Sequence, residues 1–243
     1  MHINILTIFP EIFDALNYGV IGKAKTNKSF SIKLQDIRDY PVNKHGQIDS
    51  KPYGGGEGMV MMAEPLKRSL ESIPKEKLGK IIYLSPQGAL FDNTKAKELS
   101  KEPSATFICG RYEGIDQRFI DKYVDEEISI GDFIISGGEI AALCIIDSII
   151  RHIPGVLGNK DSSKNDSFSN GLLKGPQYSR PEVFEEISVP DILLSGDHKK
   201  IKEWKDLKSI EATIIRRPDL LNNVKLTKKQ RKLLEDLASQ SIL

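Results

Sequence analysis

An α/β fold built on a parallel sheet is predicted by the order of the apolar segments. Short, β-branched runs that suit buried strands alternate with segments of helical pattern from residue 3 to residue 153. Such alternation is typical of a parallel sheet covered by helices on both faces. Three of the strand candidates also end in glycine-bearing turns. Sheets of this class bind ligands at the carboxyl ends of their strands.

The first segments begin this pattern. Residues 3–9 (INILTIF) form an apolar strand candidate that Pro10 ends. Residues 10–16 are predicted to be helical, because proline suits the first helical position and Glu11 lies in the first turn. Residues 31–37 alternate apolar and polar side chains, as a strand does.

The middle of the chain repeats the alternation. Residues 63–73 have a helical pattern, and residues 80–85 form a second apolar strand candidate. Residues 92–100 are predicted to be a helix with Asp92 as its N-cap. Residues 105–110 (ATFICG) form another buried strand candidate.

Three further segments complete the predicted layer structure. Residues 114–124 have a helical pattern, and residues 126–136 form an extended, β-branched run. Residues 138–153 are a long helix so apolar that it must be buried on most sides. Cys109 and Cys144 lie within apolar runs, which indicates buried thiols rather than a disulfide.

The glycine-bearing turns follow three of the predicted strands: LSPQG (84–88), GRYEG (110–114) and SGGE (136–139). In a parallel sheet these turns would gather at one edge. One interpretation is that each is only a tight turn. The other is that together they form a shared pocket.

A further run of glycines, PYGGGEGM (52–59), raises the question of a phosphate-binding loop. A P-loop would need Gly-Lys-Ser/Thr at its end, and Gly58 is followed by Met59. The spacing does not fit the Gly-x-Gly-x-x-Gly dinucleotide pattern either. The loop must therefore serve another purpose.

Composition and charge are those of an ordinary globular protein, with 243 residues, 28% charged residues and a net charge of +1. The N-terminus has no secretory signal, and the longest apolar stretch (140–150) contains Asp147 and is too short to span a bilayer. We expect a cytoplasmic protein with no membrane contact. The four histidines are too scattered to suggest a metal site.

The C-terminal part differs from the rest. Residues 159–171 are small and polar, which indicates a linker or lid. Residues 181–207 and 226–240 are predicted to be mainly helical, with Thr227 capping the latter segment. Residues 191–243 carry twelve basic and eight acidic side chains. This excess is compatible with a polyanion partner or with solvated helices alone.

Eleven short strings occur in an order that is specific for one family. The chain resembles the bacterial tRNA (guanine-N1)-methyltransferases, the TrmD family of the SPOUT superfamily, from about residue 1 to about residue 235. The strings are IFPEIF, YGVIGKA, KPYGGGEGM, YLSPQG, CGRYEGID, SIGDFIISGGE, IPGVLGN, DSF, YSRPEVFE, VPDILLSGDH and RRPDLL.

The resemblance implies a SPOUT-type parallel sheet with a deep trefoil knot, an exception to the rule that chains do not thread loops. It implies a knotted methyltransferase domain (1–158), a flexible linker that carries the catalytic aspartate (159–170) and a helical tRNA-binding domain (171–243). It also implies that the knot loops bind S-adenosyl-L-methionine. The matching positions are Leu84, Ser85, Pro86, Gln87, Gly110, Tyr112, Glu113, Ile130, Gly131, Asp132, Phe133, Ile134, Ile135, Gly137 and Gly138.

The reaction implied is methylation of N1 of the guanosine at tRNA position 37. Asp166 matches the family's general base, although an aspartate in a polar linker is otherwise read as a solvated loop residue. Arg151 matches an active-site arginine that could stabilise charge on guanine O6. Without the resemblance, the sequence around Arg151 favours an arginine that binds the free carbonyl groups at the C-terminus of a helix. Asp49, Tyr53, Gly54, Gly55 and Ser167 are expected at the guanine.

This chain departs from the family pattern at Glu57 and Ala141, where proline is usual. The resemblance further implies a homodimer with shared active sites and a magnesium requirement, for which we identify no protein site. Two alternatives remain: an RNA-binding protein that kept the fold without the chemistry, and a nucleotide-dependent enzyme with a Rossmann-like sheet. The retained Asp166 and Arg151 argue against the former, and the missing phosphate motifs argue against the latter.

Overall fold

The computed structural model describes residues 1–157, 166–224, 226–227, 230–232 and 234. The chain divides into two compact units, Met1–Gly158 and Asn159–Leu243. The described part contains no helix long and apolar enough to cross a membrane.

A five-stranded parallel sheet forms the centre of the first unit. Its strand order is β2-β1-β6-β5-β7, and every neighbouring pair is parallel. The strands are β1 (His2–Thr7), β2 (Ser31–Asp36), β5 (Lys80–Leu90), β6 (Ser104–Cys109) and β7 (Glu126–Ser129). The predicted α/β class with a parallel sheet is therefore confirmed.

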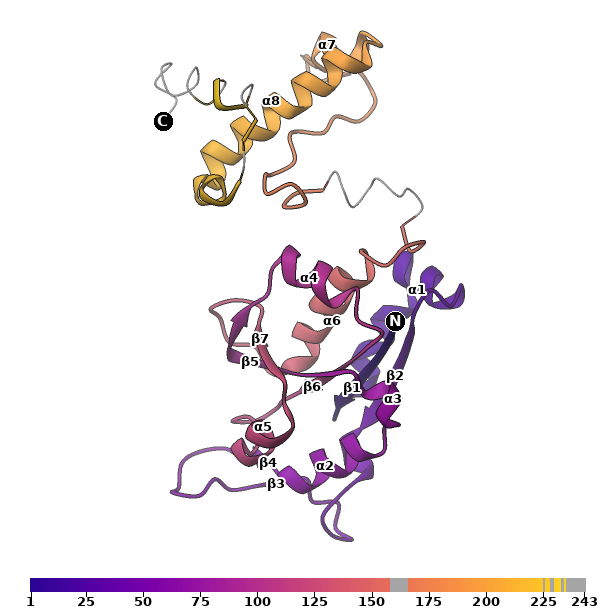
Figure 1. The fold of residues 1–243 in the computed structure, drawn as a ribbon, viewed down its shortest axis with the longest axis vertical. Coiled ribbons are helices and arrows are strands. Elements are labelled where there is room, and N and C mark those ends of the chain that lie inside the picture. Colours follow the sequence, from indigo (N-terminus) through magenta and orange to yellow (C-terminus); the bar gives the residue numbers. More distant parts are fainter. Residues whose placement is uncertain (158–165, 225, 228–229, 233, 235–243) are drawn as a thin grey trace. The chain divides into compact units, whose positions relative to one another are not determined.

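Helices cover both faces of this sheet (Figure 1). One face packs against α6 (Gly138–Ile150) and α4 (Asn93–Leu99), and the other against α2 (Ala63–Glu71) and α5 (Gln117–Tyr123). The strands feed the two cores alternately, because successive side chains point to opposite faces. In β6, for example, Phe107 packs on the α6 side of the sheet, and the next residue, Ile108, packs on the α2 side.

Local signals account for several helix starts. Asp92 accepts a hydrogen bond from the Lys95 backbone N–H at 2.8 Å, which confirms the predicted N-cap of α4. Asp116 caps α5 in the same way through the Arg118 N–H.

Helix α6 contains an i, i+4 series of buried isoleucines and alanines, but Cys144 on this helix is exposed. The prediction of a buried thiol holds for Cys109 and is wrong for Cys144.

The predicted helix after β1 is confirmed at Pro10–Asn17, where it is a 3₁₀ helix (η1) with Pro10 at its start and Glu11 in its first turn. Another prediction in the first unit needs correction. The extended run predicted to residue 136 ends at Ser129, and residues 130–137 form a loop. The remaining elements are α1 (Gly19–Thr26), η2 (Ile37–Asp39), β3 (Asp49–Ser50), β4 (Val60–Met61) and α3 (Lys75–Leu78).

An ion-pair cluster joins the amino ends of β5 and β7 to α4. The Glu126 carboxylate lies 2.6 Å from Lys80 Nζ and 2.6 Å from Lys95 Nζ. The contact with Lys80 is an ion pair without well-aligned hydrogen-bond geometry. Burial opposes ionisation of the Glu126 carboxyl, but the two ammonium groups lower its pKa overall. The same contact raises the pKa of Lys95.

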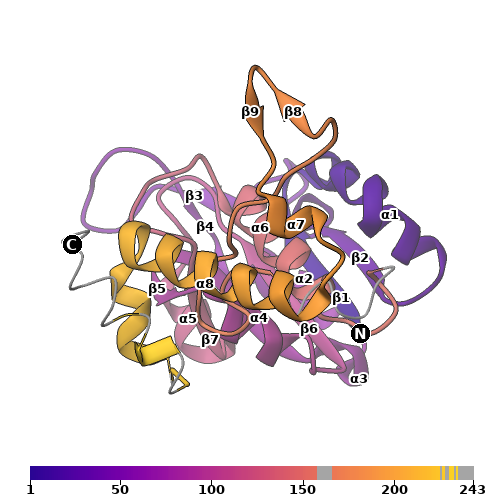
Figure 2. The same cartoon turned by 90° about the horizontal axis from the view of Figure 1, so that it is seen from above.

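The second unit has a small core of its own in which Leu172 packs with Ile210 and Ile214 of α8. Its described elements are β8 (Val183–Phe184), β9 (Ile187–Ser188), α7 (Asp191–Leu194), α8 (His198–Arg216) and η3 (Pro218–Asn223). Figure 2 shows the β8–β9 hairpin and the long helix α8.

Within this unit, the prediction of a mainly helical segment from residue 181 is wrong for residues 181–190. That stretch contains the hairpin, and Glu185 and Glu186 have positive φ angles that a helix does not allow. Thr227 and Gln230 exchange hydrogen bonds in the manner of a capping box. Most of the helix predicted after Thr227 lies outside the described residues.

Candidate functional site

A cavity of about 350 Å³ lies at the carboxyl ends of β6 and β7 and against the middle of β5. Three segments form its walls, namely residues 83–87, 110–114 and, except for residue 132, 128–138, together with Ala141. These segments contain the three glycine-bearing turns that the sequence predicts at one edge of the sheet. Strands β6 and β7 end at this edge, and the first turn lies in β5, where the register shifts between Leu84 and Ala89.

The cavity collects almost all the residues predicted to contact a cofactor. Only Asp132 is not among the lining residues. The predicted residues that line the cavity are Leu84, Ser85, Pro86, Gln87, Gly110, Tyr112, Glu113, Ile130, Gly131, Phe133, Ile134, Ile135, Gly137 and Gly138. The wall thus combines apolar residues, the acidic residue Glu113 and several glycines.

Glycine is required where the cavity walls pack together. A Cβ atom at Gly138 would lie 2.8 Å from Cys109 Cα, and a Cβ atom at Gly110 would lie 2.8 Å from the Tyr83 ring. The Gly138 N–H donates to the Gly110 carbonyl at 2.9 Å. The start of α6 and the end of β6 are therefore in backbone contact.

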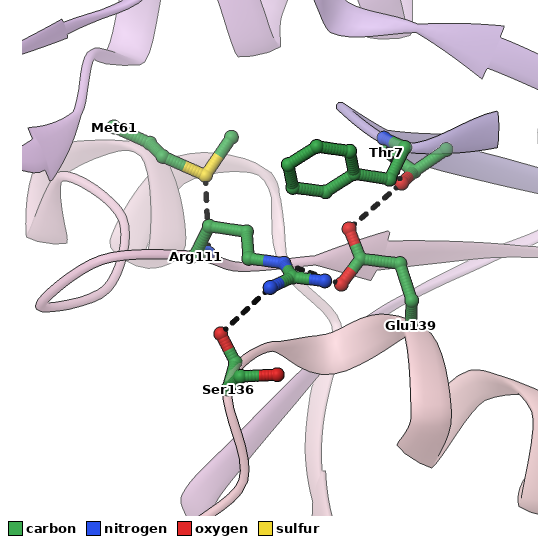
Figure 3. A network of polar contacts seen from close by, with 6 residues as sticks. Thr7, Met61, Arg111, Ser136 and Glu139 are labelled. Atoms are coloured by element: carbon green, nitrogen blue, oxygen red, sulfur yellow. Dashed lines mark hydrogen bonds and ion pairs between the residues drawn. The ribbon is translucent and has the colours of Figure 1, made fainter. Parts of the chain in front are cut away.

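A polar network connects the cavity wall to the buried Glu139 carboxylate (Figure 3). Arg111 Nε donates to Glu139 Oε2 at 2.8 Å, and Arg111 Nη1 donates to the Ser136 carbonyl at 3.0 Å. The Thr7 hydroxyl donates to Glu139 Oε1 at 2.8 Å. The guanidinium carbon of Arg111 also lies 4.6 Å from the centre of the Phe9 ring.

Two ionisable groups near the cavity stay neutral at physiological pH. Burial and the nearby Glu127 charge raise the pKa of the Tyr83 hydroxyl to about 12. Burial and the Glu139 charge raise the pKa of the Cys109 thiol well above its usual value. Neither group is suited to proton transfer near pH 7.

The glycine run lies in the loop between β3 and β4. These strands pair antiparallel, with Asp49 opposite Met61. Gly54, Gly55 and Gly58 have φ angles of +85°, +82° and +78°, which favour glycine strongly. The far end of the loop is attached to the cavity wall, because Glu113 N donates to the Met59 carbonyl at 2.9 Å.

The predicted substrate residues in this region lie beside the cavity, not in its wall. Tyr53 is 99% exposed, and neither it nor Gly54 and Gly55 line the cavity. Asp49 is linked to the wall through Tyr112, whose pKa is raised by burial and by the charge and hydrogen bond of Asp49. Tyr112 also has an unusual positive φ of +61°.

The predicted catalytic residues belong to different units. Arg151 is the exposed C-cap residue of α6 in the first unit. Asp166 and Ser167 belong to the second unit. There, the Asp166 carboxylate is 38% exposed and lies 3.7 Å from Lys174 Nζ, and Ser167 Oγ accepts from the Lys174 N–H at 3.0 Å. Lys174 was not predicted as a site residue.

The described residues contain no group of three or more His, Cys, Asp or Glu side chains that could hold a metal ion.

The sequence analysis did not identify Arg111, Glu139 and Thr7 as site residues. Arg111 lies inside the quoted string GRYEG and Glu139 ends SGGE, so both strings contained the signal. Their mutual contact spans 28 residues and could not be read from the pattern.

Comparison with known proteins gives a consistent result. The model of the family described as tRNA (Guanine-1)-methyltransferase TrmD matches residues 1–223. A tRNA (guanine-N(1)-)-methyltransferase of Clostridium novyi (strain NT) is 50% identical over 235 residues, which cover 97% of each chain. Proteins of the same name from Clostridium beijerinckii (strain ATCC 51743 / NCIMB 8052) and Clostridium botulinum (strain Loch Maree / Type A3) are 49% and 48% identical over 97% of this chain and 98% of theirs.

Proposed function

The chain belongs to the tRNA (guanine-N1)-methyltransferase family TrmD, and we propose that it methylates N1 of the guanosine at tRNA position 37, beside the anticodon, with S-adenosyl-L-methionine as methyl donor. The observation that carries this proposal is the cavity in which the three glycine-bearing loops meet. A tRNA substrate is expected in the cytoplasm, where tRNA serves translation.

The residues around the cavity fit the proposed donor. Its volume of about 350 Å³ lies within the usual range for small-molecule sites. Leu84, Ile130 and Ile135 offer apolar contacts for an adenine ring, and loop backbone groups can bind the ring nitrogens. Glu113 supplies a negative charge suited to the cationic part of the donor. When bound, S-adenosylmethionine supplies a methyl group on a positively charged sulfur that departs as a neutral thioether.

Asp166 has the chemistry of the base in this reaction. Guanine N1 carries a proton, and its lone pair becomes a good nucleophile only as that proton leaves. Carboxylates are ionised at neutral pH, and the Asp166 carboxylate is exposed enough to accept a proton. The proton from N1 passes to Asp166, and the N1 lone pair forms the new bond to the methyl carbon. General-base catalysis of this kind is worth about 100- to 10,000-fold in rate.

The other substrate contacts are assigned by charge and reach. Arg151 is proposed to stabilise the negative charge that develops on guanine O6. Asp49, Tyr53, Gly54, Gly55 and Ser167 are proposed to bind the guanosine. The exposed backbone of the glycine loop supports this role, because base recognition needs close backbone approach.

The larger-scale features of the family are part of the same proposal. The three cavity loops would be tied into a trefoil knot, and two chains would form a homodimer with shared active sites. The domains are proposed at residues 1–158, 159–170 (linker) and 171–243. The last domain would grip the tRNA backbone through Lys199, Lys200, Lys202, Arg216 and Arg217. Magnesium remains part of what the family implies, and we assign no step to it.

A methylation assay tests the reaction and the base together. The chain is incubated with S-adenosylmethionine labelled in its methyl group and with tRNA transcripts that carry G or A at position 37. Wild type, Asp166→Ala and Asp166→Asn are compared with Asp121→Asn, which changes an exposed aspartate on α5 that does not line the cavity.

We expect label only on the G37 transcript, with loss of at least about 100-fold in both Asp166 variants and no loss in Asp121→Asn. Label on the A37 transcript would refute the specificity for guanine. Undiminished labelling by Asp166→Asn would remove Asp166 from its role as base.

A further inference from the structure

We propose that the buried Glu139 carboxylate is a positioning residue for the donor cavity, because through Arg111 it fixes the loop that ends at Ser136. This inference rests on the proposed function, since the position of the loop affects catalysis only if the cavity binds S-adenosylmethionine. Glu139 itself does not line the cavity. Its role is therefore to hold other groups in place, not to touch the donor.

Burial and two hydrogen bonds fix the position of the Glu139 carboxylate. The side chain is completely buried, and a buried charge is unfavourable unless it is paired and hydrogen-bonded. Both oxygens have partners, because Oε1 accepts from the Thr7 hydroxyl and Oε2 from Arg111 Nε, each at 2.8 Å. Thr7 is itself fully buried and accepts from the Phe9 N–H. The anion is thus fixed to the end of β1.

Arg111 transmits this position to the cavity wall. While Nε binds Glu139, Nη1 donates to the Ser136 carbonyl at 3.0 Å, and both Arg111 and Ser136 line the cavity. The planar guanidinium can make both contacts at once because its donors form a rigid fork. The backbone at Gly137 lies directly against it, since a Cβ atom there would come within 2.2 Å of Arg111 Nε.

The network therefore joins two of the three cavity loops to one buried anion (Figure 3). Glu126 provides a useful contrast within the same unit. It is also a largely buried carboxylate with two cationic partners, Lys80 and Lys95, but none of these three residues lines the cavity. If Glu139 only stabilised the fold, its loss should resemble the loss of Glu126.

Four variants separate positioning from stability. Glu139→Gln leaves the Arg111 cation without its anion. The double variant Glu139→Gln with Arg111→Met removes both charges, which often restores stability when a buried pair is replaced. Arg111→Lys keeps a cation for Glu139 but cannot bridge to Ser136 as the fork does. Glu126→Gln is the matched control. Thermal unfolding, the Kd for S-adenosylmethionine by calorimetry, and KM and kcat with tRNA are measured for each.

We expect Glu139→Gln, Arg111→Lys and the double variant each to weaken donor binding by about tenfold or more, the effect of losing one charge-assisted hydrogen bond. The KM for the donor should rise while kcat at saturating donor stays within about threefold, because the reacting groups are untouched. The double variant should regain much of the unfolding temperature that Glu139→Gln loses, without regaining donor affinity. Glu126→Gln should lower the unfolding temperature and leave the Kd unchanged.

A double variant that binds the donor as tightly as wild type would overturn the inference, as would a Glu126→Gln control that weakens binding equally. If the double variant does not fold, wild-type affinity in Arg111→Lys overturns the inference and a tenfold loss supports it. A wild-type protein that binds no S-adenosylmethionine would overturn the proposed function as well, and this outcome is recognised before any variant is made.

Discussion

Replacement of Gly138 by alanine tests how closely the cavity walls pack. The new Cβ atom would lie 2.8 Å from Cys109 Cα and 3.1 Å from the Gly110 nitrogen. Carbon atoms prefer a separation of about 3.5–4.0 Å, so the two segments must move apart. That movement lengthens the hydrogen bond of 2.9 Å from the Gly138 N–H to the Gly110 carbonyl.

The expected cost follows from these contacts. Overpacking costs about 1–3 kcal/mol and the weakened hydrogen bond about 1 kcal/mol. Alanine regains at most about 1 kcal/mol of helix propensity, because Gly138 is the first residue of α6. The net loss of about 2 kcal/mol corresponds to a fall of ~4–8 °C in Tm for a unit of this size. Donor binding should weaken by about tenfold or more, since both displaced segments line the cavity.

Calorimetry of unfolding and of S-adenosylmethionine binding measures both effects. Gly175→Ala is the control, because its Cβ atom would also be crowded, at 3.2 Å from Lys208 Cβ in the second unit, whereas Gly175 does not line the cavity. Donor affinity should therefore stay unchanged in this variant. An unchanged Tm in Gly138→Ala would refute the close packing of α6 on β6. A lowered Tm with unchanged donor affinity would refute the assignment of these segments to the donor site.

Three further predictions concern stability, substrate binding and RNA affinity. The pKa of Glu126 is lowered in the folded state, so its ion pairs stabilise the protein fully above the usual glutamate pKa of about 4.3. This stabilisation is lost as the pH falls through the lower pKa of the folded state. Glu126→Gln should therefore reduce Tm at pH 7, and thermal scans toward pH 3 should show a shrinking difference from wild type. Tyr112→Phe keeps the aromatic ring that lines the cavity and removes only the hydroxyl that binds Asp49. We therefore expect a higher KM for tRNA with little change in donor Kd, and equal loss of both would contradict a substrate-side role for this hydroxyl. Changing Lys199 and Lys200 to glutamine should weaken tRNA binding and reduce the slope of log K against log salt by about one per lost phosphate contact, whereas an unchanged slope in filter-binding titrations would exclude these side chains from the RNA contact.

Much of the first unit was predictable because its signals are local. The apolar runs at β1, β5 and β6 and the Asp92 cap depend on residues close in sequence. The gathering of three turns at one edge follows from the parallel order of the strands, and the cavity lies there. Helix α1 was missed because Gly19–Thr26 has no clear apolar stripe and buries only Gly22 and Ala24.

Other features depend on contacts that no local pattern contains. The carboxylate of Glu139 meets Thr7 across 132 residues and Arg111 across 28. The exposure of Cys144 depends on which side of α6 faces the sheet, and an almost wholly apolar helix does not reveal that side. The pattern of residues 183–188 does not distinguish a hairpin from a helix, because glutamates and apolar residues suit both structures. Only the backbone at Glu185 and Glu186 distinguishes them.

A crystal structure of the chain with bound S-adenosylmethionine measures the location of the donor site. We expect the donor among residues 84–87, 110–113 and 130–138, with its methyl group open to the substrate side. Donor density at any other position on the chain would contradict the proposed methyl-transfer site and, with it, the roles assigned to the loops around it.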